Sequence, residues 1–419
     1  MNPIEAVVPA RLGTSFRWLL ASTVVGNIGD GVALAAGPLL VASQTHDPLL
    51  VAAAAFLQRL PWLVLGVFAG AIVDRIDRRR LVIAVDSLRA VVLAALTATI
   101  VTGVVDITVV LVVMFVMGTA EVFADIAGST LLPNMVARED LGIGNARLMG
   151  SYLVTNQLVG PPIGAALFVA GRAWPFGVNA LCCLLGAMLV ARVAVRPVPD
   201  DERARRSVRA EVADGVRWLW RHPPVRTLAL TILLFNLTYG AAWSVLVLYA
   251  TQRLGMSEFG FGLLTTAVAV GGAVGIASYG WLERHFSLGN MMRACLLTET
   301  LSHLAFALTR SPYVAMATMV AFGTEAFVWA TTSTTVRQRA VPSALLGRVQ
   351  SVYMIGLFGG LLVGQAIGGV LARHCGLTAP FWFGFVGSAL LLAGIWRPLT
   401  SIAHAGDKGR RSTAGPAEA

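Results

Sequence analysis

Apolar runs of about twenty residues recur along the whole chain and constrain its fold more than any other feature. A helix needs about 20 mainly apolar residues to cross the roughly 30 Å hydrocarbon core of a bilayer. The mean hydropathy of +0.73 and the 13% of charged residues also fit a membrane protein better than a soluble core of this size. Runs this long exclude a β-barrel, whose strands are short and alternate. We therefore expect an all-α membrane protein with about twelve transmembrane helices, at roughly 16–41, 48–73, 81–102, 107–130, 148–170, 174–195, 227–251, 259–282, 289–309, 312–335, 348–372 and 379–396.

Basic residues are distributed unevenly around these predicted spans. The formal net charge is +10, and most of the 32 Lys and Arg residues fall on one side of the membrane. Cytoplasmic loops carry such an excess, so we expect both termini in the cytoplasm and interpret the charge as orienting the chain, with no nucleic-acid partner. The exceptions are Arg172, Arg253, Arg310 and Arg373 on the opposite side, and Arg59 and Arg89 within spans.

Several absences narrow the class of protein further. The first apolar run is too long for a signal-peptide core and carries Asp30, so we interpret it as a retained span. The four cysteines have no metal-ligand spacing and the six histidines are scattered, which argues against a metal site and against a membrane enzyme. Lys408 is the one lysine and does not stand in a phosphate-binding loop, so we expect no cofactor and an ion gradient as the energy source.

The loop between the second and third predicted spans is strongly charged. Residues 70–80 read GAIVDRIDRRR, a pattern that resembles the signature loop of the major facilitator superfamily, G-x-x-x-D-R-x-G-R-R. Asp77 departs from it, because the family has glycine there. An ordinary positively charged turn that only orients the chain is the alternative interpretation. The matching positions are Gly70, Asp74, Arg75, Arg78 and Arg79.

The two halves of the chain resemble each other. Adding 209 to Asn27 and Gly31 leads to Asn236 and Gly240, and adding 204 to a later set of first-half residues again leads to like residues. Two nearly constant offsets indicate a duplicated six-span unit, which is the plan of this superfamily. The later set is Glu121, Phe123, Ser129, Thr130, Gly160, Ile163 and Gly164, matched by Glu325, Phe327, Ser333, Thr334, Gly364, Ile367 and Gly368.

From this repeat we predict two pseudo-symmetric six-helix bundles, at 1–196 and 227–396. Residues 197–226 form a cytoplasmic linker with an amphipathic helix, whose arginines and tryptophans suit a membrane surface. Residues 397–419 are polar and rich in Gly, Arg and Ser, which predicts a disordered tail.

Four charged residues lie near the middle of predicted spans, where an ionisable group requires a partner or a function. They are Asp30, Arg59, Glu121 and Glu325. In the superfamily, spans 1, 4, 7 and 10 line the central cavity, so the resemblance implies that the three acids face it. We hypothesise that Arg59 pairs with Asp30 or Glu121 and that a remaining carboxylate takes up a proton. A static ion pair between helices is the alternative.

Other acids are expected at the gate and at the periphery. The resemblance implies that Asp125, one turn past Glu121, pairs with Arg78 and helps to close the cytoplasmic side. Asp86 and Arg89 form an intrahelical pair at i, i+3 or join the same network. Glu299 and His303, four residues apart in span 9, form either a structural pair or a proton relay.

Span 5 contains the run VGPPIG, which resembles part of the motif found in exporters of the superfamily. Pro161 removes helix hydrogen bonds and sets a bend, while Gly160 and Gly164 allow close helix packing. Asn156 and Ala165 stand where the fuller motif has glycine. The resemblance favours export over uptake.

The segments LPNMV before span 5 and VPSALLGRV before span 11 resemble the bacterial branch of the superfamily that exports drugs and siderophores. Over residues 12 to 396 this resemblance implies a monomeric, proton-coupled antiporter in the bacterial inner membrane, which exports amphipathic small molecules such as lipophilic cations. The alternatives are a dedicated exporter of a siderophore or other metabolite, an uptake permease, and a membrane scaffold that transports nothing.

Overall fold

The computed structural model describes residues 12–73, 76–129, 131–132, 135–194, 208–342 and 345–399. These ranges form an all-helical membrane protein without β-strands, which confirms the predicted fold class. The helices of the first half are α2 (Gly13–Gln44), α3 (Pro48–Val73), α4 (Arg78–Val101), α5 (Ile107–Ser129), α6 (Leu141–Ser151), α7 (Gly160–Ala170) and α8 (Trp174–Val190). The others are α9 (Val208–Arg221), α10 (Pro223–Trp243), α11 (Leu246–Leu248), α12 (Glu258–His285), α13 (Leu288–Leu308), α14 (Pro312–Ala340), α15 (Leu346–Cys375) and α16 (Ala379–Ile395).

Apart from the linker helix α9, the described helices form twelve membrane spans. Among the described residues, nine helices are long and apolar enough to cross a membrane, and α8 and α16 are shorter apolar helices. The twelfth, α13, has a spanning length of 21 residues but is less apolar, because it carries Arg293, Glu299 and His303. Span 5 combines α6, the π-helical segment η4 (Tyr152–Val159) and α7, while span 7 combines α10, α11 and the π-helical segment η5 (Tyr249–Arg253).

The chain divides into two compact units. The first holds the described residues up to 204 together with Gly255–Thr266, and the second holds Arg205–Leu254 and the described residues from 267 onward. The linker helix α9 thus belongs to the second unit, and the start of α12 belongs to the first. The predicted domain boundaries, at 196 and 227, stay a prediction.

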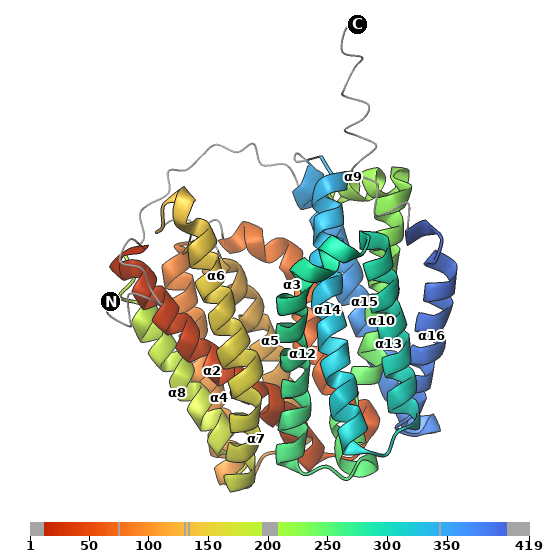
Figure 1. Cartoon of the computed structure of the whole chain (residues 1–419). Helices are drawn as coiled ribbons and strands as arrows, with labels where there is room; N and C mark the ends of the chain where they lie inside the picture. Colours follow the sequence, from red (N-terminus) through yellow and green to blue (C-terminus); the bar gives the residue numbers. More distant parts are fainter. Residues whose placement is uncertain are drawn as a thin grey trace, which may run out of the picture. The chain divides into compact units, whose positions relative to one another are not determined.

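In the first unit, α2 is the central helix and packs against α7 and α8, while α3 pairs with α5 and α4 with α8 (Figure 1). Its core at one end includes Phe16 on α2 and Leu131 after α5, both fully buried. In the second unit, α10 packs against α15 and α16, and α13 packs against α14 and α16. Its core holds Met292 and Leu296 of α13 with Trp329 of α14.

Glycines let helices of each unit touch through their backbones, and they do so at equivalent places. A Cβ added at Gly164 of α7 would lie 2.1 Å from the carbonyl oxygen of Val32 on α2. The repeat carries these residues to Gly368 and Ala241, where a Cβ would lie 2.2 Å from the Ala241 oxygen. Small residues allow such close approach in membrane interfaces. The sequence repeat is therefore also a repeat of helix contacts.

The double proline of span 5 sits next to a wide helical turn. Because Pro161 and Pro162 have no backbone N–H, the carbonyls one turn earlier lose their usual α-helical donors. The residues before the prolines form η4, and the N–H of Gly160 donates to the carbonyl of Thr155, five residues back. The predicted break in the regular α-helix is thus a π-helical segment, which is one of the known causes of a helix kink.

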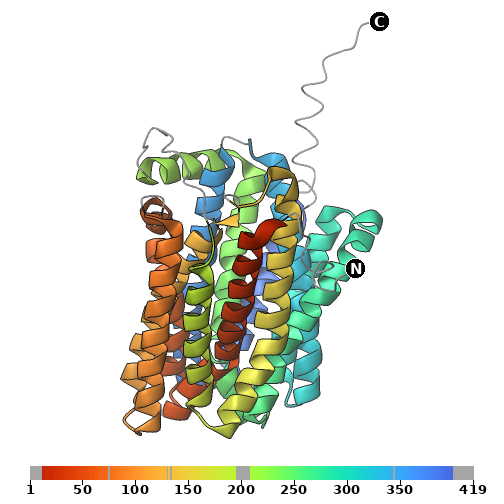
Figure 2. The ribbon, with the colours of Figure 1, turned by 90° about the vertical axis from the view of Figure 1, so that its left-hand side faces the viewer.

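The linker helix α9 runs across the ends of α10 and α15 (Figure 2). Leu219 of α9 is buried with Val349 of α15, and Arg348 lies 3.4 Å from Asp214. A Cβ at Gly215 would lie 2.7 Å from the carbonyl oxygen of Arg348, so α9 touches the backbone of α15. The apolar face of α9 is therefore turned towards protein, while Trp220 is exposed.

Candidate functional site

An ion pair joins α3 and α5 inside the first unit. The Arg59 Nη1 atom donates to Glu121 Oε1 at a distance of 3.4 Å, and the two side chains are 35% and 34% exposed. Of the two partners predicted for Arg59, the structure brings Glu121 to it. An ion pair that is one-third exposed contributes little free energy, so its two side chains can separate and bind other partners.

Asp30 has a different partner, which the sequence analysis did not assign to it. Arg89 of α4 contacts the Asp30 carboxylate of α2 through Nη2, and its Nη1 atom lies 3.3 Å from Asp86 Oδ1. Arg89 is buried, whereas Asp30 is half-buried. One guanidinium has five N–H donors and can therefore bind two carboxylates. The intrahelical pair is present, and the same guanidinium also contacts Asp30 of α2.

The two ion pairs are neighbours within the first unit. Arg89 interacts electrostatically with Glu121 as well as with Asp30, and Asp125 interacts with both of those acids and with Arg59. Asp125 lies on α5, one turn beyond Glu121, and is exposed. Four helices, α2 to α5, thus place four acids and two arginines in one connected cluster.

Tyr152 of η4 completes this cluster and was not predicted. It interacts with Arg59 and Glu121, and its hydroxyl accepts a hydrogen bond from Gln157 Nε2 at 2.9 Å. Tyr152 stands at the first residue of the π-helical segment, so the wide turn is what sets the position of its ring. The signal in the sequence was a tyrosine about two and a half helical turns before a double proline, inside an otherwise apolar span.

Close helix packing brings these charges together. A Cβ at Gly118 of α5 would lie 2.0 Å from the carbonyl oxygen of Gln58 on α3, the residue before Arg59. Gly118 also precedes Glu121 by one helical turn, so the glycine contact and the ion pair stabilise the same crossing. In the same way, a Cβ at Gly160 would lie 2.4 Å from the Cα atom of Gly31, the residue after Asp30.

The signature loop is only partly described. Gly70 lies in the last turn of α3, whereas Asp74 and Arg75 lie outside the described residues. Arg78 and Arg79 begin α4, and Asp77 caps this helix by accepting from the N–H of Arg80 at 3.0 Å. The acid that replaces the family's glycine thus has a local structural role. Arg79 reaches the carbonyl of Ala191, just after α8. The pairing of Asp125 with Arg78 stays a prediction.

The fourth predicted residue, Glu325, lies in the second unit in a different setting from Glu121, its counterpart in the repeat. Glu325 of α14 is only 4% exposed and interacts with Glu299 of α13, which is fully buried. His303 is also fully buried, with Nδ1 at 3.4 Å from Glu299 Oε1. Among the described residues, no cluster of His, Cys, Asp and Glu has the geometry of a metal site.

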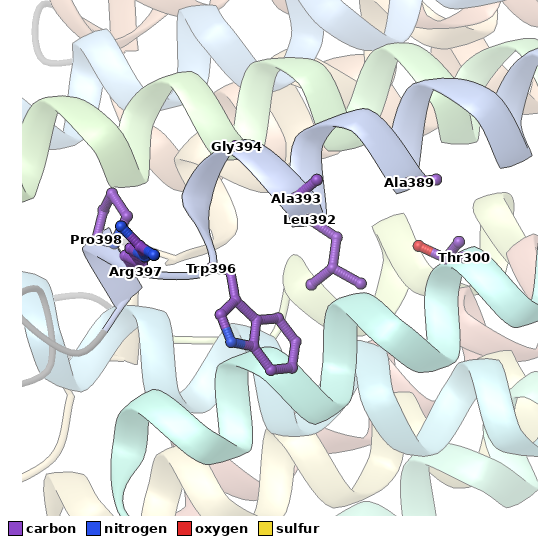
Figure 3. Close-up of a pocket in the computed structure, with 8 residues that line it drawn as sticks. All are labelled: Thr300, Ala389, Leu392, Ala393, Gly394, Trp396, Arg397 and Pro398. Carbon is purple, nitrogen blue, oxygen red and sulfur yellow. The ribbon is translucent and has the colours of Figure 1, made fainter.

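One pocket of the second unit lies apart from these charges. It has a volume of about 670 Å³ and lies between α13 and the end of α16 (Figure 3). Leu392 and Trp396 line it on one side and Thr300 on the other, while Arg397 and Pro398 stand at its end. Its apolar lining and its place between two helices suit a lipid chain more than a polar substrate.

Comparison with known proteins assigns the chain to a family. A family model described as "Transmembrane secretion effector" matches residues 5–409. The chain is 29% identical over 383 residues to the multidrug efflux pump Tap of Mycolicibacterium fortuitum, which covers 87% of this chain and 90% of the relative. It is 24% identical over 387 residues to the enterobactin exporter EntS of Shigella boydii serotype 4, covering 91% and 90%.

The same fold occurs in solved transporter structures. The crystal structure of a bacterial homologue of the iron transporter ferroportin, in its inward-facing state, matches with a TM-score of 0.71 at 16% identity, over 93% of this chain and 98% of that one. An all-helical body of about twelve spans, a duplicated unit and relatives that are exporters mark a multi-pass membrane transporter and not an enzyme. The chain belongs to the transmembrane secretion effector family, within the major facilitator superfamily.

Proposed function

We propose that the protein is a proton-coupled antiporter that exports amphipathic small molecules by alternating access. The observation that carries the proposal is the cluster of the first unit, in which Arg59 and Glu121 pair at 3.4 Å while a third of each side chain stays exposed. Ionisable groups inside a membrane are expensive and mark ion and substrate pathways. The relatives Tap and EntS, named as a multidrug pump and an enterobactin exporter, support export.

The cluster offers a physical route to coupling. A carboxyl group loses its proton readily beside an arginine and keeps it when the arginine moves away in a desolvated site. In our proposal Arg59 leaves Glu121 in one state of the cycle, and Glu121 then binds a proton. Arg89 holds Asp30 and Asp86 throughout, since it is buried between them. In this proposal the exposed pair Arg59–Glu121 forms and breaks during the cycle, whereas Arg89 stays bound to Asp30 and Asp86.

The charge balance of the cluster suggests the substrate class. Asp30, Asp86, Glu121 and Asp125 outnumber Arg59 and Arg89, which leaves a net negative charge facing an incoming molecule. Lipophilic cations match this sign, and the ring of Tyr152 offers them an aromatic face. We therefore place lipophilic cationic drugs first among the substrates.

The signature loop supplies the gate in this proposal. Gly70, Asp74, Arg75, Arg78 and Arg79, together with Asp125, close the cytoplasmic side, and Gly160, Pro161 and Gly164 provide the bend and the close packing of span 5. The membrane is the bacterial inner membrane, with both termini in the cytoplasm, and the transporter acts as a monomer in the lipid bilayer.

The decisive experiment uses inverted membrane vesicles that are energised with a proton gradient. Lipophilic cations are added one at a time, and we expect the gradient to collapse in vesicles with the protein and not in vesicles with E121Q. Gln keeps the size of the side chain and removes its charge, and equal abundance of the two proteins is checked by immunoblot. A gradient that stays intact with every cation would overturn the proposal.

A dedicated metabolite exporter is the second candidate function. Its support is the likeness to EntS, which extends over 91% of this chain. A catecholate siderophore belongs in the same vesicle panel. Collapse of the gradient by the siderophore alone would replace the multidrug assignment, while a response to neither class would favour uptake or a scaffold without transport.

A further inference from the structure

Two carboxyl groups and an imidazole meet inside the second unit, and no Lys or Arg among the described residues pairs with them. Glu299 and His303 lie on one face of α13 and Glu325 lies on α14, with exposed fractions of 0%, 0% and 4%. These two helices pack directly against each other. Carboxylates inside a membrane are normally paired with a cation or placed in a wet cavity. This group is buried and has no Lys or Arg partner among the described residues, so its chemistry needs another explanation.

The hydrogen bonds of the group are incomplete. Neither oxygen of the Glu299 carboxyl and neither oxygen of the Glu325 carboxyl has a hydrogen-bond donor. The two carboxyls interact with each other across the α13–α14 contact. His303 Nδ1 lies 3.0 Å from the backbone oxygen of Glu299, so this nitrogen carries the hydrogen and donates it to the carbonyl. A proton on one carboxyl would supply the donor that the other lacks.

The neighbouring helices contribute no compensating charge. On α13 itself, the Cys295 thiol lies within electrostatic reach of Glu325, and α16 has no ionisable residue between Ala379 and Ile395. From α10, the ring edge of Trp243 faces His303 at 5.8 Å between centroids, beside the backbone of Thr238. The arginines of these helices have contacts elsewhere: Arg226 with Trp220, Arg293 with Trp396, Arg337 with Ser333, and Arg339 with Glu283 of α12. On α12, Glu258 stands in the first turn, Tyr279 contacts Thr332, Arg284 contacts the carbonyl of Gly280, and His285 contacts the carbonyl of Trp281.

The backbone of α16 closes the remaining side. A Cβ at Gly384 would lie 2.1 Å from His303 Cδ2, so the imidazole ring sits directly against the helix backbone. The group is therefore occluded by α10, α14 and α16 at once. Two adjacent carboxyls in such a site cannot both be ionised, as in the paired acids of aspartic proteases, where one proton is shared.

We propose that Glu299 and Glu325 form a proton-binding site in the second unit, in which one carboxyl holds a proton and donates it to the other carboxylate. On release, the O–H bond breaks, the proton passes to water, and both carboxylates remain. Release therefore requires that α14 or α16 moves and admits water, which couples the proton to a conformational change. This inference rests on the proposed antiport and adds to it a second proton-binding site, separate from Glu121.

The test measures the proton directly. Infrared spectroscopy of the purified protein in lipid nanodiscs reports the carbonyl stretch of a protonated carboxyl group. We expect this band to be present at neutral pH, to move when the glutamates alone carry carbon-13, and to persist in E121Q. In E299Q and in E325Q the remaining buried carboxyl keeps a proton but loses its carboxylate acceptor, so the wild-type band disappears and a band at higher frequency replaces it in both.

Isotope labelling keeps the test decisive if the Gln variants fold poorly, because Glu299 and Glu325 are the buried glutamates of the described residues and both remain in labelled E121Q. Absence of the labelled band at neutral pH would overturn the proposal, as would a band unchanged in both folded variants.

Transport measurements distinguish a failure of the proton site from a failure of the proposed antiport. A protein that shows the band but moves none of the panel would refute antiport and leave the proton site standing. Variants without the band should keep substrate exchange down its own gradient and lose transport driven by the proton gradient.

Discussion

Gly360 of α15 and Leu233 of α10 meet backbone to backbone: a Cβ at position 360 would lie 2.2 Å from the carbonyl oxygen of Leu233. The next residue towards the N-terminus, Gly359, faces open space. Two adjacent glycines of one helix therefore differ only in the surface they meet, which makes them a matched pair for mutation.

We expect G360A to lower the stability of the protein and G359A to leave it unchanged or slightly higher. A carbonyl oxygen cannot rotate away as a side chain can, so the new methyl group must push α15 from α10, and overpacking of this kind costs about 1–3 kcal/mol. Alanine at an open helical position gains up to about 1 kcal/mol over glycine in soluble helices. Thermal unfolding in detergent compares the two variants. Equal midpoints would show that the helices are further apart in solution.

The pair Arg59–Glu121 should matter for transport and little for stability. Because both side chains are about a third exposed, solvent screens their attraction, and such pairs contribute about 0–1 kcal/mol. E121Q and R59Q should therefore melt close to the wild type while transport is lost. The double exchange R59E/E121R restores the pair but moves the acid to α3, so it should fold and remain inactive. Transport by the exchanged protein would mean that the pair is only a static link.

Substitution of Arg89, in contrast, should lower the stability of the protein. It is buried between Asp30 and Asp86, so R89A leaves two acids without their cation, and breaking a buried pair costs about 3–5 kcal/mol. Arg217 is the control, since its partner Asp214 is on the surface helix α9 and its own side chain is 64% exposed. R217A should change stability by less than about 1 kcal/mol. The measurement is the unfolding midpoint of both variants; an R89A midpoint equal to that of R217A would contradict the arrangement.

The end of α13 depends on side chains from span 7. The carbonyls of the last helical turn have no donor within the helix, and the fully buried Tyr249 donates its O–H to the carbonyl of Phe306 at 2.6 Å. Arg253 Nε donates to the carbonyl of Thr309 at 3.3 Å. We expect Y249F to cost about 1–3 kcal/mol, because it leaves a buried carbonyl unsatisfied.

Tyr313 provides the control for this change, since its side chain is 85% exposed and Y313F should leave the unfolding midpoint where it is. Hydrogen exchange of the backbone amides near residue 306 should become faster in Y249F. Unchanged exchange there would indicate that water or another donor replaces the tyrosine hydroxyl.

The spans, the repeat and the depth of the charges could be predicted from the sequence because each follows from a one-dimensional rule. Apolar length sets the spans, and Glu121 and Glu325 share their depth through the constant offset of the repeat. The faces to which these charges point could not be predicted in the same way. Glu121 meets an arginine and stays partly exposed, whereas Glu325 is buried against a second acid.

The partner of Asp30 was missed for a related reason. Asp86 and Arg89 stand three residues apart on one helix, and such a pair looks complete in the sequence. The guanidinium has donors to spare, however, and the packing of α2, α4 and α8 brings Asp30 to them. Which groups a multivalent side chain joins depends on helix packing and not on spacing along one helix. The wide turn that positions Tyr152 likewise depends on hydrogen bonds that proline removes at a distance.

The weak apolar character of α13 has a consequence for how the protein reaches its membrane. A charged residue at the centre of a helix adds about 2.5–3.5 kcal/mol to the free energy of insertion through the translocon, and α13 carries Glu299 and His303 near its centre. We therefore expect α13 alone to pass poorly from the translocon into the lipid bilayer. When α14 follows from the ribosome, Glu325 gives Glu299 its partner and the two helices can enter as one hairpin. We therefore expect α13 to insert efficiently only after the nascent chain extends beyond residue 340.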